Sequence, residues 1–172
     1  MLSVEQIELF KAFAIIFGLA VAGYGYVKGQ LKQRRAKSKK LLTFFNDKIS
    51  SADIQLWSKI VQASTEASGA KTGMYITAQK KHVKLMSLFD DKATDQGATA
   101  KITQEIEFLC SQVLTDSYDL PTIALEIGQL MTVIYDWFKD ENTFIENYPN
   151  FVKVMSEKEI SRFPFKTLVS TD

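Results

Sequence analysis

The feature that most constrains this chain is an uncharged, strongly apolar stretch close to its N-terminus. The stretch Ala12–Val27 holds sixteen residues without an acid or a base. As a helix it would span roughly 24 Å, whereas the hydrocarbon core of a bilayer is about 30 Å thick. Snorkelling of Lys11 and Lys28 toward the two headgroup layers extends the usable length to residues 7–31. The sequence therefore predicts a single transmembrane helix over residues 5–30.

A basic segment, called here the basic collar, follows this stretch directly. Residues 41–172 carry 13 basic and 18 acidic residues, a net charge of −5, so the positive charge is concentrated next to the apolar stretch. Cytoplasmic loops hold the excess of Lys and Arg in membrane proteins. We therefore expect a single-pass protein of the inner (cytoplasmic) membrane, with the N-terminus outside and the C-terminal domain cytoplasmic. The collar has seven basic residues and no acid: Lys28, Lys32, Arg34, Arg35, Lys37, Lys39 and Lys40.

The apolar stretch has two other interpretations. A cleaved signal peptide is suggested by Ala20-Val21-Ala22, but such peptides carry positive charge before the apolar run, and here Glu5 and Glu8 precede it. A buried helix of a soluble domain is the second alternative. The basic collar and the pair Tyr24 and Tyr26, at the end where interfacial aromatics concentrate, favour the membrane interpretation.

Small residues recur within the apolar stretch. Ala14, Gly18 and Ala22 are spaced four apart, and Gly25 and Gly29 continue a similar spacing on a neighbouring face. Small residues at this spacing let membrane helices approach closely, although Gly and Ala are common in membrane helices in any case. The pattern predicts a homo-oligomer formed through Ala14, Gly18, Ala22 and Gly25.

The rest of the chain has mostly helical periodicity, and no convincing period-2 strand. Residues 31–46 are expected to extend the membrane helix, and residues 47–172 to form a cytoplasmic bundle, giving an all-α fold with about four to six helices after the anchor. The first helix expected in the body starts at Ser51 or Asp53, and three longer ones are expected over Met74–Phe89, Thr99–Thr115 and Thr122–Phe138. A brief helix interrupted near Pro149 follows them. A last short helix is opened by a capping box at Ser156 and stopped by Pro164.

Residues that could carry catalysis or bind a metal are few. The only histidine, His82, falls on the apolar side of the predicted helix Met74–Phe89, and the only cysteine, Cys110, falls on a predicted core position. Neither has a partner at metal-ligand spacing. The acidic pairs, such as Glu105 with Glu107, are interpreted as solvent-exposed. We therefore expect no enzyme activity, no cofactor and no metal.

The basic collar has two interpretations. Polybasic segments beside a membrane helix most often set topology and attract anionic lipid. Clustered positive charge can also contact nucleic-acid phosphates. The acidic body makes direct nucleic-acid binding the less favoured alternative, so membrane lipids are the expected partner.

This order of elements resembles a known class of proteins. An N-terminal anchor, a basic collar and a helical body closing with the apolar stripes Ile102–Leu114 and Ile123–Phe138 are similar to the accessory membrane proteins of type VI CRISPR systems. The resemblance implies a divergent HEPN-like helical domain, oligomeric membrane pores and a functional link to an RNA-guided RNase. Nuclease HEPN domains carry an arginine four to six residues before a histidine. No arginine lies in residues 72–81 before His82, and no histidine follows Arg162, so no catalytic residue is implied.

Three functional hypotheses follow. The first is a non-enzymatic membrane-anchored protein that homo-oligomerises and perturbs or permeabilises the inner membrane, as an accessory of antiviral defence. The second is a membrane-anchored adaptor that docks a partner in a larger membrane complex. The third is an RNA-processing enzyme that uses His82. The adaptor would present exposed C-terminal aromatics to its partner: Phe144, Tyr148, Phe151, Phe163 and Phe165.

Overall fold

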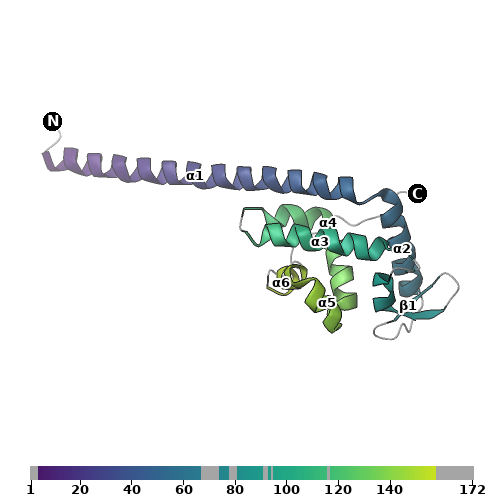
Figure 1. Cartoon of the computed structure of the whole chain (residues 1–172). Helices are drawn as coiled ribbons and strands as arrows, with labels where there is room; N and C mark the ends of the chain where they lie inside the picture. Colours follow the sequence, from purple (N-terminus) through teal and green to yellow (C-terminus); the bar gives the residue numbers. More distant parts are fainter. Residues whose placement is uncertain are drawn as a thin grey trace.

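The computed structural model describes residues 4–66, 74–77, 81–90, 93, 95–115 and 117–157, and the side chains of residues 4–15, 65 and 66 lie outside this description. Within these ranges the chain forms six α-helices, one two-stranded antiparallel sheet and a short 3₁₀-helix. The prediction of a mostly helical, all-α protein is confirmed. Figure 1 shows a long first helix that runs past a body made of the remaining elements.

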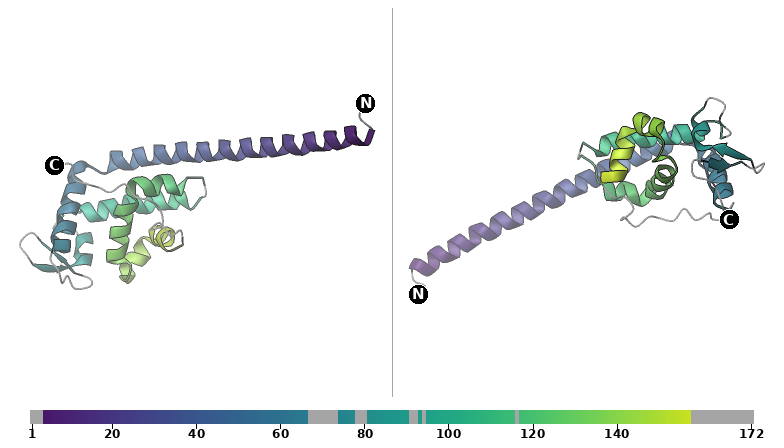
Figure 2. Two further views of the ribbon diagram at one scale, coloured as in Figure 1. Left: turned by 180° about the vertical axis from the view of Figure 1, so that it is seen from behind. Right: turned by 90° about the horizontal axis from the view of Figure 1, so that it is seen from below.

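Helix α1 (Val4–Lys48) is continuous over 45 residues. The segments predicted as membrane helix and extension therefore form one helix, because no proline or other strong breaker interrupts them. Its first half projects away from the body in every view (Figures 1 and 2). Among the described residues, no helix meets the combined length and hydropathy expected of a membrane span.

Helix α2 (Ser51–Glu66) begins at a reciprocal capping interaction. The Asp53 carboxylate accepts hydrogen bonds from the Ser50 amide at 2.9 Å and hydroxyl at 2.7 Å, and the Ser50 hydroxyl accepts from the Asp53 amide at 3.1 Å. Lys101 Nζ lies 2.7 Å from the same carboxylate. Hydrogen bonds from Lys101 and Ser50 lower the pKa of Asp53 to about 2. The predicted start at Ser51 is confirmed.

The predicted helix Met74–Phe89 is wrong. Strands β1 (Met74–Ile76) and β2 (His82–Lys84) pair antiparallel, with Tyr75 opposite Val83, and the 3₁₀-helix η1 (Leu85–Phe89) follows. The expectation that the chain has no strand is therefore also wrong. Tyr75 is fully buried, and the Ile76 amide donates to the Ser64 hydroxyl of α2 at 3.2 Å. Packing against α2 outweighs the weak local helical spacing.

Helices α3 (Ala98–Val113) and α4 (Leu120–Phe138) confirm two of the predicted helices. Asp95, almost fully buried, accepts from the amides of Gly97 and Thr99 at 3.1 and 2.7 Å. Asp119 caps α4 by accepting from the Thr122 amide at 3.2 Å. Such caps satisfy the free amides at a helix start.

Two short helices, α5 (Asn142–Asn147) and α6 (Pro149–Glu157), confirm the predicted interruption near Pro149. Glu107 of α3 caps α6 across the fold, since its carboxylate accepts from the Asn150 amide at 3.1 Å and the Phe151 amide at 2.7 Å. Its interpretation as a solvent-exposed charge is wrong. Ser156 lies in the last turn of α6, where its hydroxyl donates to the Val152 carbonyl, rather than at a helix start. The rest of that predicted last helix, residues 158–164, lies outside the described residues.

An aromatic cluster forms the centre of the body. Phe138, Phe144 and Phe151 are fully buried, and Phe89 lies 5.0 Å from Phe138 between ring centroids. The expectation that Phe144 and Phe151 face a partner is wrong, because both complete the core around α3 and α4. Tyr148 is half-buried against Phe144. Phe163 and Phe165 lie outside the described residues.

The second half of α1 packs against α3 and α4. Ser38, Leu42, Phe45 and Ile49 are buried, at spacings of four, three and four residues. This spacing places all four on one helix face. The residues predicted as an extension therefore also contribute to the core of the body.

Candidate functional site

Residues 16–31 of α1 expose large apolar side chains on every side except the one that carries Gly18, Ala22, Gly25 and Gly29. Eight of them are between 42% and 71% exposed, and this part of α1 projects away from the body (Figure 1). A helix that is apolar all round normally lies in a core or in a bilayer. This surface therefore needs a cover that the described part of the chain does not provide. The eight residues are Ile16, Phe17, Leu19, Val21, Tyr24, Tyr26, Val27 and Leu31.

The small residues of α1 share one face. Gly18, Ala22, Gly25 and Gly29 fall within an arc of about 60° at 100° per residue, so Gly25 and Gly29 belong to the same face as Gly18 rather than a neighbouring one. Backbone geometry places Ala14 beside them, although its side chain lies outside the described part. We call these five positions the small-residue face. A Cβ added to Gly18, Gly25 or Gly29 would meet nothing within 4 Å.

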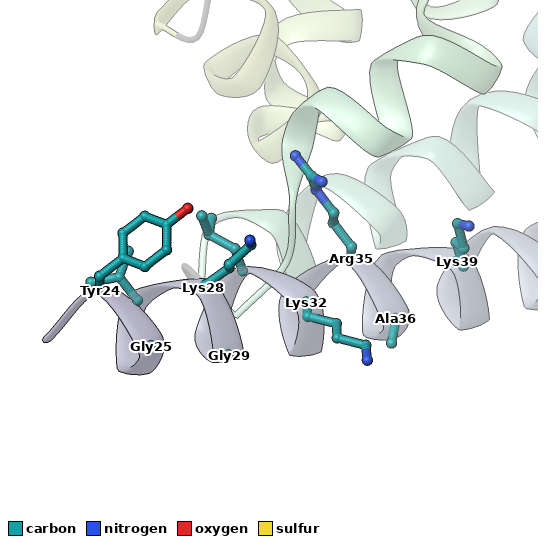
Figure 3. Close-up of a pocket in the computed structure, with 10 residues that line it drawn as sticks. Tyr24, Gly25, Lys28, Gly29, Lys32, Arg35, Ala36 and Lys39 are labelled. Carbon is teal, nitrogen blue, oxygen red and sulfur yellow. The ribbon is translucent and has the colours of Figure 1, made fainter. Parts of the chain in front are cut away.

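The small-residue face points away from the body. The face that carries Ser38 and Leu42 lies about 150° around the helix from it. In Figure 3 Lys32 and Ala36, which continue the small-residue face, point away from the body. Tyr24, Lys28 and Arg35 point toward the body side. A second helix could therefore contact the small-residue face without displacing the body.

All seven residues of the basic collar are exposed. They point in directions all around α1 rather than along one stripe, because neighbouring positions differ by about 100°. Two have described partners: Lys28 Nζ lies 5.4 Å above the ring of Tyr24, and Arg35 Nε lies 3.7 Å from an Asp119 carboxylate oxygen. The remaining five form no ion pair within the described residues.

Two contacts, both with Asp119, connect α1 to the start of α4. The buried hydroxyl of Ser38 accepts a hydrogen bond from the Asp119 amide at 2.7 Å. The Asp119 side chain is 10% exposed and also caps α4, while Arg35 remains 65% exposed. Ser38 and Asp119 were not among the candidate residues from sequence. The spacing Tyr24, Lys28, Leu31, Arg35, Ser38, alternately four and three, was a signal that could have located this face.

The surface of α1 between Tyr24 and Lys39 is hollowed (Figure 3). Its lining within the described residues comes from α1 alone. Tyr24 and Val27 make its N-terminal end apolar, Lys28, Leu31 and Lys32 mix charge with apolar surface in the middle, and Arg35 and Lys39 make its other end basic. The hollow therefore joins the apolar first half of α1 to the basic collar.

The residues considered for catalysis lie elsewhere. His82 is exposed on β2, not on the apolar face of a helix. Cys110 is fully buried in α3, and burial raises the pKa of its thiol well above the usual range. A thiol of this kind is a poor nucleophile, since the thiolate is the reactive form. In the part of the chain that the structure describes, no three His, Cys, Asp or Glu side chains form a group that could hold a metal ion.

The chain matches no protein-family model, no curated protein and no solved structure.

Proposed function

We propose that this chain is a non-enzymatic, single-pass protein of the inner membrane. Its first helix spans the bilayer, associates with copies of itself and perturbs or permeabilises the membrane. The observation that carries the proposal is the stretch of α1 from Ile16 to Leu31, which exposes large apolar side chains on every side but the small-residue face and projects away from the body (Figure 1). Lipid covers such a surface on every side at once, whereas a single protein partner covers one side.

The basic collar supports the proposed orientation. Its charges surround the helix just after the apolar half, where the headgroups of the cytoplasmic leaflet would lie. A surface built for nucleic acid would instead gather its charges on one side. The body then lies in the cytoplasm and the N-terminus outside.

The open small-residue face supports self-association. Glycine inside a helix costs about 0.5–1 kcal/mol relative to alanine, and nothing within the described residues requires Gly18, Gly25 or Gly29 to lack a Cβ. Close packing of a second copy's helix against this face requires small residues at these positions, and its contacts offset the free-energy cost of glycine within a helix. The setting in antiviral defence, beside an RNA-guided RNase, rests on the architectural resemblance alone.

The first experiment compares two glycine substitutions. Gly18 belongs to the small-residue face, whereas Gly23 points about 140° away from Gly18; a Cβ at either position meets nothing within 4 Å. Gly18→Leu should reduce both the detergent-solubilised mass and the leakage of dye from reconstituted vesicles. Gly23→Leu is the matched control and should change neither.

Two outcomes would contradict the proposal. A wild-type chain that does not float with vesicles is not a membrane protein. A wild-type chain that floats but is monomeric and causes no leakage or depolarisation does not act by self-association.

An adaptor function is the second candidate, and one surface favours it. Phe44 of α1 and Phe108 of α3 are 44% and 46% exposed, with ring centroids 6.0 Å apart. Exposed aromatic pairs are typical anchors of protein interfaces. Phe108→Ser should abolish partner capture from cells without altering vesicle leakage. Loss of leakage with unchanged capture would count against this function.

A further inference from the structure

The hollow between Tyr24 and Lys39 has two chemically different ends. Tyr24, Val27 and Leu31 are 67%, 56% and 42% exposed and offer an apolar surface. Lys28, Arg35 and Lys39 offer three positive charges on the side of α1 that faces the body, called here the basic corner (Figure 3). A ligand that fits both ends has an apolar tail and an anionic head.

The position of the hollow along α1 matches the edge of a bilayer. Tyr24 and Val27 close the uncharged stretch, and Lys28 is the first charge after it. Arg35 lies about 10 Å further along the helix. The headgroup layer of one leaflet is of a similar thickness, roughly 5–8 Å. Lys28 therefore lies at the inner edge of this layer, while Arg35 and Lys39 lie beyond its outer edge, Lys39 about 16 Å along the helix from Lys28. Helical side chains lean toward the helix N-terminus, so those of Arg35 and Lys39 reach back toward the lipid phosphates when the apolar half spans the membrane.

The Arg35 side chain of the basic corner is only weakly paired within the described residues. Arg35 is 65% exposed, and its contact to the Asp119 carboxylate is long, at 3.7 Å. That carboxylate is already engaged by the Thr122 amide at the start of α4. The guanidinium thus keeps donors available for phosphate, which it binds in a bidentate manner. Lys28 and Lys39 add charge on either side.

We propose that the basic corner binds one anionic phospholipid per chain. Arg35 and Lys39, about one helical turn apart, hold its phosphate, Lys28 adds charge at the boundary of the apolar stretch, and its acyl chains lie along Tyr24 and Val27. The proposal rests on membrane insertion of α1.

The test compares two triple substitutions with equal loss of charge. One removes the basic corner: Lys28→Gln, Arg35→Gln and Lys39→Gln. The control removes one arginine and two lysines from other sides of α1: Arg34→Gln, Lys37→Gln and Lys40→Gln. Full-length proteins are reconstituted in phosphatidylcholine vesicles that contain some phosphatidylglycerol. They are then extracted in mild detergent, and the retained phosphatidylglycerol is counted by native mass spectrometry.

Wild type and control should each retain one phosphatidylglycerol per chain. Each basic charge near the surface contributes roughly a factor of five to anionic-lipid affinity, so the basic-corner triple should bind about 100-fold more weakly and retain none. Flotation of every variant with the vesicles tests the anchor separately. A chain that floats while both triples retain lipid equally overturns this inference and leaves the proposed function standing.

Two further arms identify the ligand. Excess inorganic phosphate should not displace the retained lipid; displacement would assign the basic corner to free phosphate. An RNA oligonucleotide should bind wild type and basic-corner triple equally weakly. Loss of RNA binding in the triple, with unchanged lipid retention, would assign these charges to nucleic acid and overturn the proposal.

Discussion

The two halves of α1 belong to one unbroken helix and have opposite surroundings. From Ile16 to Leu31 its large apolar side chains are exposed on every side but the small-residue face, and after Arg35 its apolar side chains are buried along one face. The pattern in the sequence differs accordingly: an uninterrupted apolar run in the first half, and a four-three spacing of Ser38, Leu42, Phe45 and Ile49 in the second. Helix formation is thus common to both halves, while the cover over the apolar surface differs.

The largest expected effect separates the halves by one matched substitution. Phe45 is 4% exposed and Phe17 is 71% exposed. Phe45→Ala should lower the free energy of unfolding of the body by about 3–5 kcal/mol, because it leaves a cavity in the core. Phe17→Ala should change it by less than about 0.5 kcal/mol. Urea unfolding in mild detergent, monitored by tryptophan fluorescence, measures the free energy of unfolding of both variants. Equal losses of stability would show that the two halves of α1 do not differ in their packing.

A second pair of substitutions, each adding one arginine to a different half of α1, tests membrane retention. Leu19→Arg places a charge in the proposed span, which costs about 2.5–3.5 kcal/mol at the centre of a membrane helix. We expect a large fraction of this variant to be lost from floated vesicles. Thr43→Arg adds the same charge to an exposed site in the second half and should float like wild type. If Leu19→Arg also floats unchanged, the first half is not inserted.

A smaller effect concerns the body alone. Glu107→Gln removes the carboxylate that caps α6, and should cost about 1–2 kcal/mol of stability. Glu105→Gln, on the same helix, is the control and should be nearly neutral. Neither change should alter flotation, since no contact of Glu107 involves the first half of α1. A flotation defect in Glu107→Gln would mean that the halves are coupled more closely than their packing indicates.

The smallest effect is a pH dependence just beyond the end of α1. Lys101 and Ser50 hold the pKa of Asp53 at about 2 in the folded chain, below the value of about 3.9 expected when unfolded. The stabilisation is therefore complete above pH 4 and lost as the pH falls toward 2. Asp53→Asn should flatten the stability profile in this window by less than about 1 kcal/mol, because Lys101 is largely exposed. Denaturant midpoints from pH 5 to pH 2 check it.

The sequence predicted the helices with long, regular apolar spacing, such as α3 and α4, because that spacing alone marks the buried face. It failed at the β1–β2 hairpin. The spacing of Tyr75, His82 and Leu85 fits a helix equally well, and contacts with α2 decide between the two. The cap that Glu107 makes on α6 was missed for the same reason, since 43 residues separate it from Asn150.

The candidate site was predicted in part. Charge and hydropathy identified the collar and the apolar stretch, and both are local properties of the sequence. The sequence did not reveal which collar residues face the body. That depends on where α1 meets the start of α4. The hydrogen bond between Ser38 and Asp119 that joins them links residues 81 positions apart in the sequence. The single small-residue face could have been predicted, because it follows from a turn of 100° per residue along the helix already predicted over residues 5–30.

Because α1 is continuous, the faces of its two halves keep a fixed angle to each other around the helix axis. Each residue turns the helix by about 100° and advances it by about 1.5 Å. The number of residues between Gly29 and Arg35 therefore fixes the angle, around the helix axis, between the small-residue face and the body. One inserted residue would swing that face by more than a quarter turn, and seven would nearly restore it. A rotation or axial shift of the first half would therefore act on the start of α4 where Ser38 and Arg35 contact Asp119.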